Sequence, residues 1–452
     1  MRRSSPPQPL SDTTNVTLNR VGTGADTVVV GAGVIGCAVA LELARAGRDV
    51  VVVDRAAGPG QGSTSASSAV IRFNYSTWPG VALSWEAKHC WESWREHLGA
   101  GSGEPLAGFH RTGFLMLDVP VIDHAHTTAL FDRAGVPYEI WDADTLRRRL
   151  PQLDTGRHWP PKTLQDNAFW ADAEGSLGAL WCPAGGYVDD PQLAAVNLAD
   201  AARRQGVEFR FRSTVTGFDT DAGRVRGVAL HDGTRIDAPV LVNVGGPWST
   251  TLNSLAGVGD DFTIAVQPMR QEVHAVDTTS AVVDGLPVVA DLDLGTYFRP
   301  TPGDALLIGG AEPACDPLQW LDHADEADPH PTAEVFEAQV TRAARRVPAL
   351  TVPPAPRGLA GVYDVAADWT PIYDRTALDG YYVAMGTSGN QFKNAPVAGQ
   401  LMAALVDAVE SGHDHDSDPV SFAGPHTGLT WSLGAFSRRR SVNTDSTGTV
   451  LG

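Results

Sequence analysis

The sequence contains few lysines. Only three, Lys88, Lys162 and Lys393, stand among its 34 basic residues, and the others are arginines. Any chemistry that requires a side-chain amine therefore has three candidates.

Cysteine is also scarce. The four cysteines are scattered and form no CxxC pair, which is typical of free thiols in a reducing compartment. The histidines do not gather with cysteine or carboxylate side chains at the spacing of a metal site. We therefore expect neither a disulfide framework nor a bound metal.

Long apolar runs and an excess of positive charge are missing as well. No apolar stretch approaches the ~20 residues of a membrane-spanning helix. A net charge of −19 argues against nucleic acid and anionic membranes as partners. Residues 1–24 are polar and rich in Pro, Ser and Thr, which predicts a disordered tail. No apolar segment follows Arg2-Arg3 as an export signal would require, so we expect a cytoplasmic protein.

The most informative segment covers residues 28–54. An apolar run leads into Gly31-Ala32-Gly33-Val34-Ile35-Gly36, then a helical stretch, then a second apolar run that ends at Asp54. This is the strand, glycine turn, helix, strand and acid order of a dinucleotide-binding βαβ unit. The helix N-terminus offers N–H groups to a pyrophosphate, and Asp54 can bind a ribose hydroxyl.

A glycine-rich turn in an empty α/β domain is the alternative interpretation. Two details favour FAD as the dinucleotide over NAD. The unit begins near the N-terminus, and its second strand runs into a loop of small residues at 62–68 that suits close packing around a large buried cofactor.

The rest of the chain alternates between two kinds of segment. Residues 207–238 read as a meander of short strands and 240–244 as another buried strand, whereas 264–309 suggest an antiparallel sheet. We predict an α/β (α+β) fold, in which a Rossmann-type FAD-binding domain carries an inserted antiparallel-sheet substrate domain. The predicted FAD-binding segments are 25–106, 183–256 and 353–412, the substrate segments are 107–182 and 257–352, and a C-terminal extension covers 413–452.

Four motifs together resemble the D-amino-acid oxidase/sarcosine oxidase superfamily of FAD-dependent oxidoreductases. They are the Gly31–Gly36 turn with Asp54, the 62–72 segment, Val242-Asn243-Val244-Gly245-Gly246-Pro247-Trp248, and the stretch from Gly386 to Pro396. The sequence is most similar to the sarcosine oxidase β-subunit and dimethylglycine dehydrogenase branch. The resemblance implies FAD extended in one domain with its flavin ring facing the antiparallel sheet.

The glycine motif and the resemblance together predict the residues that contact FAD: Gly31, Gly33, Val34, Ile35, Gly36, Asp54, Arg55, Gly62, Ser63, Thr64, Ser67, Ser68, Ala69, Val70, Val215, Gly245, Gly246, Trp248, Gly361, Gly389, Asn390, Gln391, Phe392 and Lys393.

The sequence departs from the family pattern at informative positions. Relatives attach flavin through a cysteine that would fall near Gly361 or a histidine that would fall near Ala66, so we predict non-covalent FAD. The strand at 306–310 lacks the lysine that monomeric sarcosine oxidases place beside the flavin to activate oxygen. This favours a dehydrogenase or a slow oxidase, although Lys162 or Lys88 could substitute from elsewhere.

Arg72 and Lys393 are the candidates for binding a substrate carboxylate. The resemblance places cations at both positions, and a carboxylate in a water-poor pocket requires a charge-assisted, preferably bidentate partner. The alternative for Arg72 is a surface or interdomain salt bridge.

Three further candidates lie in predicted strands. Tyr297 and Arg299 are two residues apart in a strand, so their side chains lie on the same face of the sheet. If that face points toward the flavin, the two residues could form the floor of the substrate pocket. Otherwise they are ordinary sheet residues. His274 could accept the amine proton near neutral pH, or it could be a paired interdomain histidine.

We predict an enzyme that oxidises the C–N bond of an amine or amino acid, with secondary or N-methylated amino acids as the leading substrates. Hydride would pass to flavin N5, leaving an imine that hydrolyses. The electron acceptor, oxygen or a redox partner, stays open. One alternative is an FAD enzyme acting on a hydroxy acid or a larger biosynthetic intermediate, which 12 tryptophans would suit. The other is a flavin-carrying subunit of a hetero-oligomeric complex.

Overall fold

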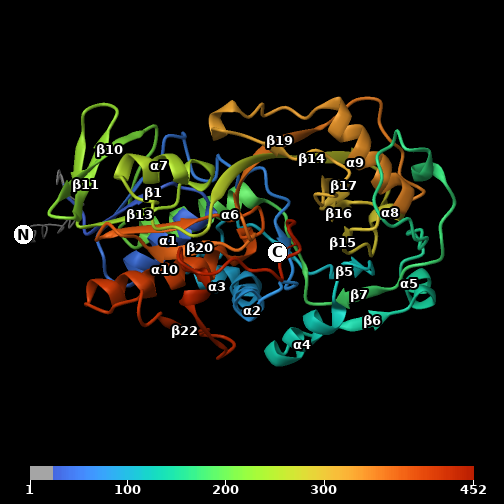
Figure 1. Ribbon diagram of the computed structural model, residues 1–452, viewed down its shortest axis with the longest axis horizontal. Helices are drawn as coiled ribbons and strands as arrows, with labels where there is room; N and C mark the ends of the chain where they lie inside the picture. Colours follow the sequence, from blue (N-terminus) through green and yellow to red (C-terminus); the bar gives the residue numbers. More distant parts are fainter. Residues whose placement is uncertain (1–23, 452) are drawn as a thin grey trace, which may run out of the picture.

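Two sheets organise the molecule, and the computed structural model describes residues 24–451 (Figure 1). The predicted tail lies outside the described residues apart from Gly24, which forms a β-bridge with Asp237. Within the described chain, no helix is long and apolar enough to cross a membrane. Nor do His, Cys, Asp and Glu side chains gather there into a group that could hold a metal.

The first sheet has six strands and contains the dinucleotide motif. Its order is β20 (Ile372–Arg375), β21 (Tyr381–Met385), β13 (Val240–Asn243), β1 (Thr27–Val30), β2 (Val50–Val53) and β9 (Glu208–Arg210). All neighbours are parallel except β20 and β21. The sheet therefore joins strands from the N-terminal, central and C-terminal parts of the chain.

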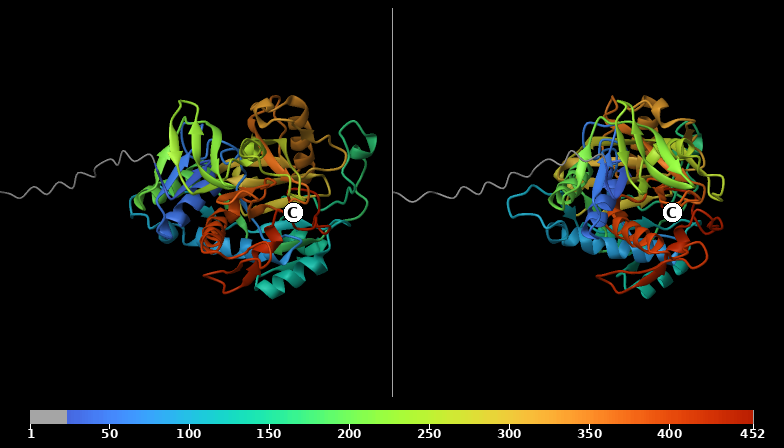
Figure 2. Two further views of the ribbon diagram at one scale, coloured as in Figure 1. Left: turned by 60° about the vertical axis from the view of Figure 1, so that its left-hand side comes forward. Right: turned by 90° about the vertical axis from the view of Figure 1, so that its left-hand side faces the viewer.

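Both faces of this sheet are covered, which explains why its strands are uninterrupted valine runs. Val29 and Val52 face a core with α1 (Val34–Arg45), α6 (Pro191–Arg204) and α10 (Ala395–Glu410). Val28 and Val51 face the opposite way. They meet the antiparallel meander of β10 (Val215–Asp221), β11 (Arg224–Leu230) and β12 (Arg235–Asp237), next to α7 (Ser249–Ala256). Figure 2 shows the yellow-green meander and the orange α10 on opposite sides of the blue strands.

The second sheet has nine strands. Its order is β18 (Gln319–Trp320), β14 (Val266–Asp277), β17 (Gly303–Gly310), β16 (Thr296–Thr301), β15 (Val288–Asp291), β5 (Phe114–Leu117), β7 (Ala179–Cys182) and β6 (Glu139–Trp141), with β19 (Gly358–Ala366) also paired to β14. The pairing is antiparallel except between β15 and β5, where the two substrate segments of the chain meet. Helix α9 (Ala333–Arg346) packs on one face.

Two connections join the half of the molecule built on the first sheet to the half built on the second sheet. β19 pairs with β14 over nine residues, although it opens a segment whose later strands belong to the first sheet. A small sheet of β3 (Val70–Ile71), β8 (Gly186–Val188) and β4 (Phe109–His110) joins the loop after the dinucleotide motif to the second half. The remaining helices are α2 (Trp78–Glu92), α3 (Trp94–Leu98), α4 (His124–Ala134), α5 (Ala143–Arg149) and α8 (Ser280–Val283).

The C-terminal extension docks on the first half through buried charges. Its hairpin of β22 (Ser421–Ala423) and β23 (Thr430–Ser432) contacts α2. Farther along, the fully buried Arg438 pairs with Asp374 at the end of β20. Arg440 then pairs with Asp368 at 2.8 Å. These pairs fix the point from which the last residues run toward the junction of the two halves (Figure 1).

Candidate active site

The glycine turn packs so tightly that only glycine fits at two of its positions. Gly31 has a φ of +115°, and a Cβ there would lie 2.3 Å from the Val244 carbonyl oxygen. A Cβ on Gly36 would lie 2.0 Å from the Gly31 carbonyl oxygen. The first turn of α1 is thereby brought directly onto the ends of β1 and β13, and its N-terminus points into a cavity.

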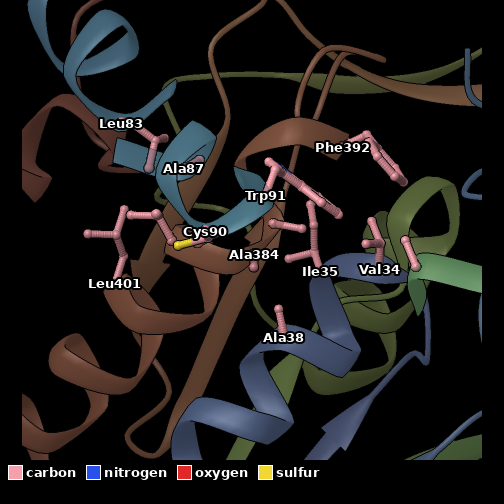
Figure 3. Close-up of a cluster of buried hydrophobic side chains, with 14 of the residues drawn as sticks. Val34, Ile35, Ala38, Leu83, Ala87, Cys90, Trp91, Ala384, Phe392 and Leu401 are labelled. Atoms are coloured by element: carbon pink, nitrogen blue, oxygen red, sulfur yellow. The ribbon is translucent and has the colours of Figure 1, made fainter. Parts of the chain in front are cut away.

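That first turn is also buried by residues from distant parts of the chain. Figure 3 shows Val34 and Ile35 near Trp91 of α2 and Phe392 of the loop before α10. The Trp91 and Phe392 rings stack with centroids 5.5 Å apart, and the Trp91 indole N–H donates to the Lys393 carbonyl at 2.7 Å. This packing places the glycine turn and the Gly386–Pro396 motif at one site, although they are far apart in sequence.

Asp54, directly after β2, lines the cavity beside the glycine turn. Asp54 accepts hydrogen bonds from the Ala32 and Ala56 backbone N–H groups, at 2.6 and 2.7 Å. These bonds orient its carboxylate beside the turn, where a ribose hydroxyl of a dinucleotide would lie.

Three side chains, Arg55, Trp248 and Asp325, form a cluster in the cavity wall next to Asp54. Arg55 lies 4.1 Å above the Trp248 ring, and Asp325 binds both, at 2.6 Å to Arg55 and 2.9 Å to the Trp248 indole N–H. Asp325 belongs to the substrate segment 257–352, and no sequence signal marked it.

The cavity measures about 850 Å³, within the range of cofactor pockets. Eighteen of the predicted FAD contacts line it: Gly31, Gly33, Val34, Ile35, Gly36, Asp54, Arg55, Gly62, Ser63, Thr64, Ser67, Val215, Gly245, Gly246, Trp248, Gly389, Gln391 and Phe392. Ser68, Ala69, Val70, Asn390 and Lys393 line an adjoining second cavity instead. Gly361 lines neither, although its neighbour Val362 lines the first.

The donors and acceptors of the first cavity fit a dinucleotide. The N-terminus of α1 begins at Gly33, which offers no side-chain cap. The Val34 N–H donates to the Thr64 hydroxyl at 3.0 Å, and the N–H groups that follow in the first turn are left for phosphate. At the other end, the buried Asp364 carboxylate receives the Thr387 hydroxyl on one oxygen, while its other oxygen has no partner among the described residues. Burial raises the pKa of Asp364. A polar group of a bound cofactor would satisfy this carboxylate.

The loop before α10 contains the buried Gln391 side chain. Gln391 has a φ of −106°, an ordinary value for a non-glycine residue. Its buried amide oxygen accepts hydrogen bonds from the Tyr373 hydroxyl and the Asn394 amide. The glutamine therefore fits without strain and ties the loop to β20.

The second cavity contains two buried cations. Arg72 is 4% exposed and Lys393 is 3% exposed. Their charged groups lie 4.9 and 5.0 Å from the Tyr75 ring centroid. Burial lowers the pKa of Lys393 well below its usual value, and the positive charge of Arg72 lowers it further. Such a site favours an anion that brings its own negative charge.

The two strand residues Tyr297 and Arg299 both lie near the second cavity, but only Tyr297 lines it. Tyr297 lines the second cavity, with its hydroxyl 2.8 Å from the Ser68 hydroxyl. Arg299 lies behind it, fully buried, donating to the Ser68 carbonyl and stacking 4.2 Å from the Tyr187 ring. Burial lowers the pKa of Arg299 to about 10. Arg299 thus holds the cavity wall and is not among the residues that line the cavity.

His274 lies outside both cavities. It is fully buried in β14, 3.5 Å from Glu272 and edge-on to Phe336 of α9. Burial lowers the pKa of His274 to about 4. Burial beside Glu272 and Phe336 is closer to the alternative of a paired histidine than to an amine base, and we leave His274 out of the proposed chemistry.

The two family positions for covalent flavin attachment lie against each other. A Cβ on Gly361 would be 2.6 Å from the Ala66 Cβ. Their neighbours Val362 and Ser67 line the cofactor cavity. Sequence spacing alone could not show that both positions reach the same point beside the cavity.

Two of the three lysines lie away from the site. Lys88 pairs with Glu92 on α2 at 2.7 Å, and Lys162 donates to the His158 and Pro160 carbonyls. Neither lines either cavity, which leaves Lys393 as the lysine of the site.

Comparison with known proteins agrees with this geometry. Residues 26–405 match the family described as DAO, FAD dependent oxidoreductase. The D-amino acid dehydrogenase of Xanthobacter autotrophicus is 26% identical over 423 residues, covering 84% of this chain and 94% of that protein. The sarcosine oxidase subunit beta of Rhodobacter capsulatus is 25% identical over 391 residues, covering 84% of each.

A solved structure shows the same fold. L-proline dehydrogenase from P. horikoshii superposes with a TM-score of 0.70 at 23% identity, covering 86% of this chain and 94% of that one. The predicted fold class and the resemblance inferred from the four motifs are thus confirmed. Because the family match spans most of the sequence, the protein belongs to the DAO family and is an FAD-dependent oxidoreductase.

Proposed function

We propose that this enzyme oxidises the carbon–nitrogen bond of an amino acid or a related amine, giving an imine that water hydrolyses. The observation that carries the proposal is the position of the second cavity, with its two buried cations, directly against the cofactor cavity. The two cavities share four lining residues, Ser67, Tyr363, Gly389 and Phe392. A small carboxylate held by the cations would therefore touch the end of the cofactor.

Each part of the second cavity has a role in this proposal. FAD, when bound, supplies the acceptor for the two electrons and the hydride from the carbon next to nitrogen. The Arg72 guanidinium binds the substrate carboxylate, whose negative charge in turn favours the protonated form of Lys393 beside it. Tyr297 offers its hydroxyl from the side of β16. The rings of Tyr363 and Phe392 form apolar walls that exclude water from the reacting carbon.

The names of the relatives support an amino-acid substrate. A D-amino acid dehydrogenase, a sarcosine oxidase subunit and an L-proline dehydrogenase are all named for the oxidation of amino acids. Two of these names specify a secondary amine, so N-methylated or cyclic amino acids remain the leading substrate class.

We further propose that the electrons pass to an acceptor other than oxygen, or only slowly to oxygen. The β17 strand bears no lysine. Lys88 and Lys162, which could have substituted, are engaged elsewhere. Oxygen activation by a cation on that side of the flavin therefore has no lysine to supply it.

Anaerobic reduction tests the proposed reaction. The FAD-loaded enzyme is mixed with sarcosine, L-proline, D-alanine and glycine, with lactate as a 2-hydroxy acid control, and the flavin absorbance near 450 nm is followed. We expect at least one amino acid to bleach the flavin and lactate to leave it oxidised. Bleaching by lactate alone, or by none of the amino acids, would contradict the proposal. Readmitting air then measures the oxygen reaction.

We also predict that FAD is released when the enzyme is denatured. Glycine and alanine at 361 and 66 bear no nucleophile, so no bond joins the flavin to the two family attachment positions. Precipitation with trichloroacetic acid should leave the yellow colour in the supernatant. A flavin that stays with the pellet after washing would contradict this prediction, and the mass of a flavin-bearing tryptic peptide would identify the attachment.

A further inference from the structure

The end of the C-terminal extension enters the second cavity. Val450 and Leu451 line it together with Arg72 and Lys393, and Leu451 is 6% exposed. Figure 1 shows this red stretch of chain between the two halves of the molecule. The segment therefore occupies the space that the proposed function assigns to the substrate.

The backbone of Val450 is held at two points. Its carbonyl oxygen accepts a hydrogen bond from Arg72 Nη2 at 2.5 Å. Its N–H donates to Glu312 Oε2 at 2.9 Å. Arg72 and Glu312 thus bind the two ends of a single residue, one by its oxygen and the other by its nitrogen.

The atoms between these two points, N, Cα and C, are the skeleton of every α-amino acid. A free amino acid placed there would present a carboxylate in place of the carbonyl and an ammonium in place of the N–H. Each replacement turns a hydrogen bond between a charged side chain and a neutral backbone group into one between two opposite charges, which is stronger. The pair would consequently bind a free amino acid better than it binds its own backbone.

We propose that Glu312 and Arg72 form a clamp that recognises the ammonium and carboxylate groups of an α-amino acid, and that Val450 holds this clamp until substrate replaces it. The inference rests on the proposed function, and it adds to that function a residue for the nitrogen end of the substrate. Glu312 lies two residues beyond the end of β17, and sequence reasoning did not mark it.

Several features fit Glu312 for this role. The Gln271 side-chain amide donates to Glu312 Oε1 at 3.0 Å and leaves Oε2 directed at Val450. Burial raises the pKa of Glu312 to about 8, whereas the nearby Arg72 charge lowers it. An ammonium group beside this carboxylate would stabilise its ionised form, so substrate binding and ionisation of Glu312 favour each other.

The size of the cavity shows that substrate and segment cannot share it. With Val450 and Leu451 in place, the remaining volume is about 60 Å³, roughly the space of two water molecules. An amino acid such as proline exceeds this, so it must displace the segment. Arg438 and Arg440 anchor the chain upstream of the segment and would remain in place when its last residues leave.

The test compares Glu312→Gln with the wild-type enzyme, and Glu337→Gln on the exposed side of α9 is the matched control. Dissociation constants are measured from the change in flavin absorbance. The ligands are used in pairs, of which only one member bears the amine: L-proline with cyclopentanecarboxylate, and D-alanine with propionate. For the amino acids, which reduce the flavin, the dissociation constant is taken from the concentration dependence of the rapid phase of anaerobic reduction.

We expect Glu312→Gln to weaken amino-acid binding about 10- to 100-fold, the range for a hydrogen bond to a charged group. Binding of the deaminated carboxylates should change less than about 3-fold, because Arg72 remains. Glu312→Asp, which keeps the charge on a shorter side chain, should fall between. Equal losses for both members of a pair, or no loss for the amino acid, would overturn the clamp and leave the proposed function standing. If no amino acid reduces the wild-type flavin, the proposed function fails and the clamp fails with it.

A second variant tests the role of Val450 independently of Glu312. Deleting residues 446–452 removes the segment but keeps the Arg438 and Arg440 anchors. Propionate, which needs only Arg72, should bind this variant more tightly than it binds the full chain. Unchanged or weaker binding of propionate would show that Val450 does not compete for the clamp.

Discussion

Replacing Arg72 with leucine is expected to lower kcat/KM for the best amino-acid substrate by about 30- to 3,000-fold. Truncating one member of a buried charge pair costs about 2–5 kcal/mol, and each 1.4 kcal/mol is a factor of ten. Arg72 is 4% exposed, so little water reaches the site to replace the guanidinium. The substrate carboxylate would be left without its principal partner.

The expected loss is not total because Lys393 shares the cavity. Arg72 lowers the pKa of Lys393, so removing the arginine raises that pKa and favours the ammonium form. Lys393 would then retain part of the attraction for the carboxylate. Arg72→Lys should give an intermediate loss, since it keeps the charge but not the planar fork of two donors.

Steady-state kinetics on FAD-loaded protein measures this effect, and Arg226→Leu is the control because Arg226 lies exposed on the meander. The control should retain wild-type kcat/KM. The Arg72 variants should also retain FAD, since Arg72 lines the second cavity and not the first. A kcat/KM within about 3-fold of wild type in Arg72→Leu would exclude Arg72 as the carboxylate-binding residue.

The first half of the molecule could be predicted well because its signals are local. The valine runs at 28–30 and 50–53 and the glycines between them determine a strand, a turn and a helix within about thirty residues. Helix α10, at Ala395–Glu410, likewise has Pro396 in its first turn, a position that proline favours. Short-range periodicity and turn chemistry suffice for such elements.

The parts that could not be predicted depend on contacts between distant segments. Asp325 reaches the cofactor cavity from a loop after β18, and Glu312 reaches Val450 across more than a hundred residues. No local pattern distinguishes these acids from the other acidic residues of a chain with 53 of them. Tyr297 shows the intermediate case, because alternation gives its face correctly but not whether that face borders a cavity.

His274 illustrates why residue type alone is weak evidence for catalysis. Its position in β14 was predicted, and histidine is the usual base near neutral pH. The packing of α9 against β14 decides its surroundings, and that packing buries the ring beside Phe336. A side chain on the wrong face of a sheet cannot reach the substrate, whatever its chemistry.

The second large effect is expected from Gly31→Ala, which should yield protein without FAD. The alanine Cβ would lie 2.3 Å from the Val244 carbonyl oxygen and 3.3 Å from the Gly245 nitrogen. Both neighbours are backbone atoms in the turn after β13, so neither can rotate away. The backbone must shift, and the shift moves α1 relative to β13 at the point where the pyrophosphate would bind.

Gly47→Ala is the matched control because it introduces backbone strain at a positive φ without a steric clash. Gly47 follows α1 with a φ of +90°, and a Cβ there would have no atom within 4 Å. Both substitutions place alanine at positive φ, which costs about 1–3 kcal/mol in each, but only Gly31→Ala forces a contact. The ratio of absorbance at 450 and 280 nm in the purified proteins should therefore be normal for Gly47→Ala and reduced at least about 10-fold for Gly31→Ala. Far-UV circular dichroism establishes whether the variant remains folded. A Gly31→Ala protein with a full complement of FAD would mean that the turn can widen without losing the cofactor, and the close packing at Gly31 would then be a feature of the fold and not of FAD binding.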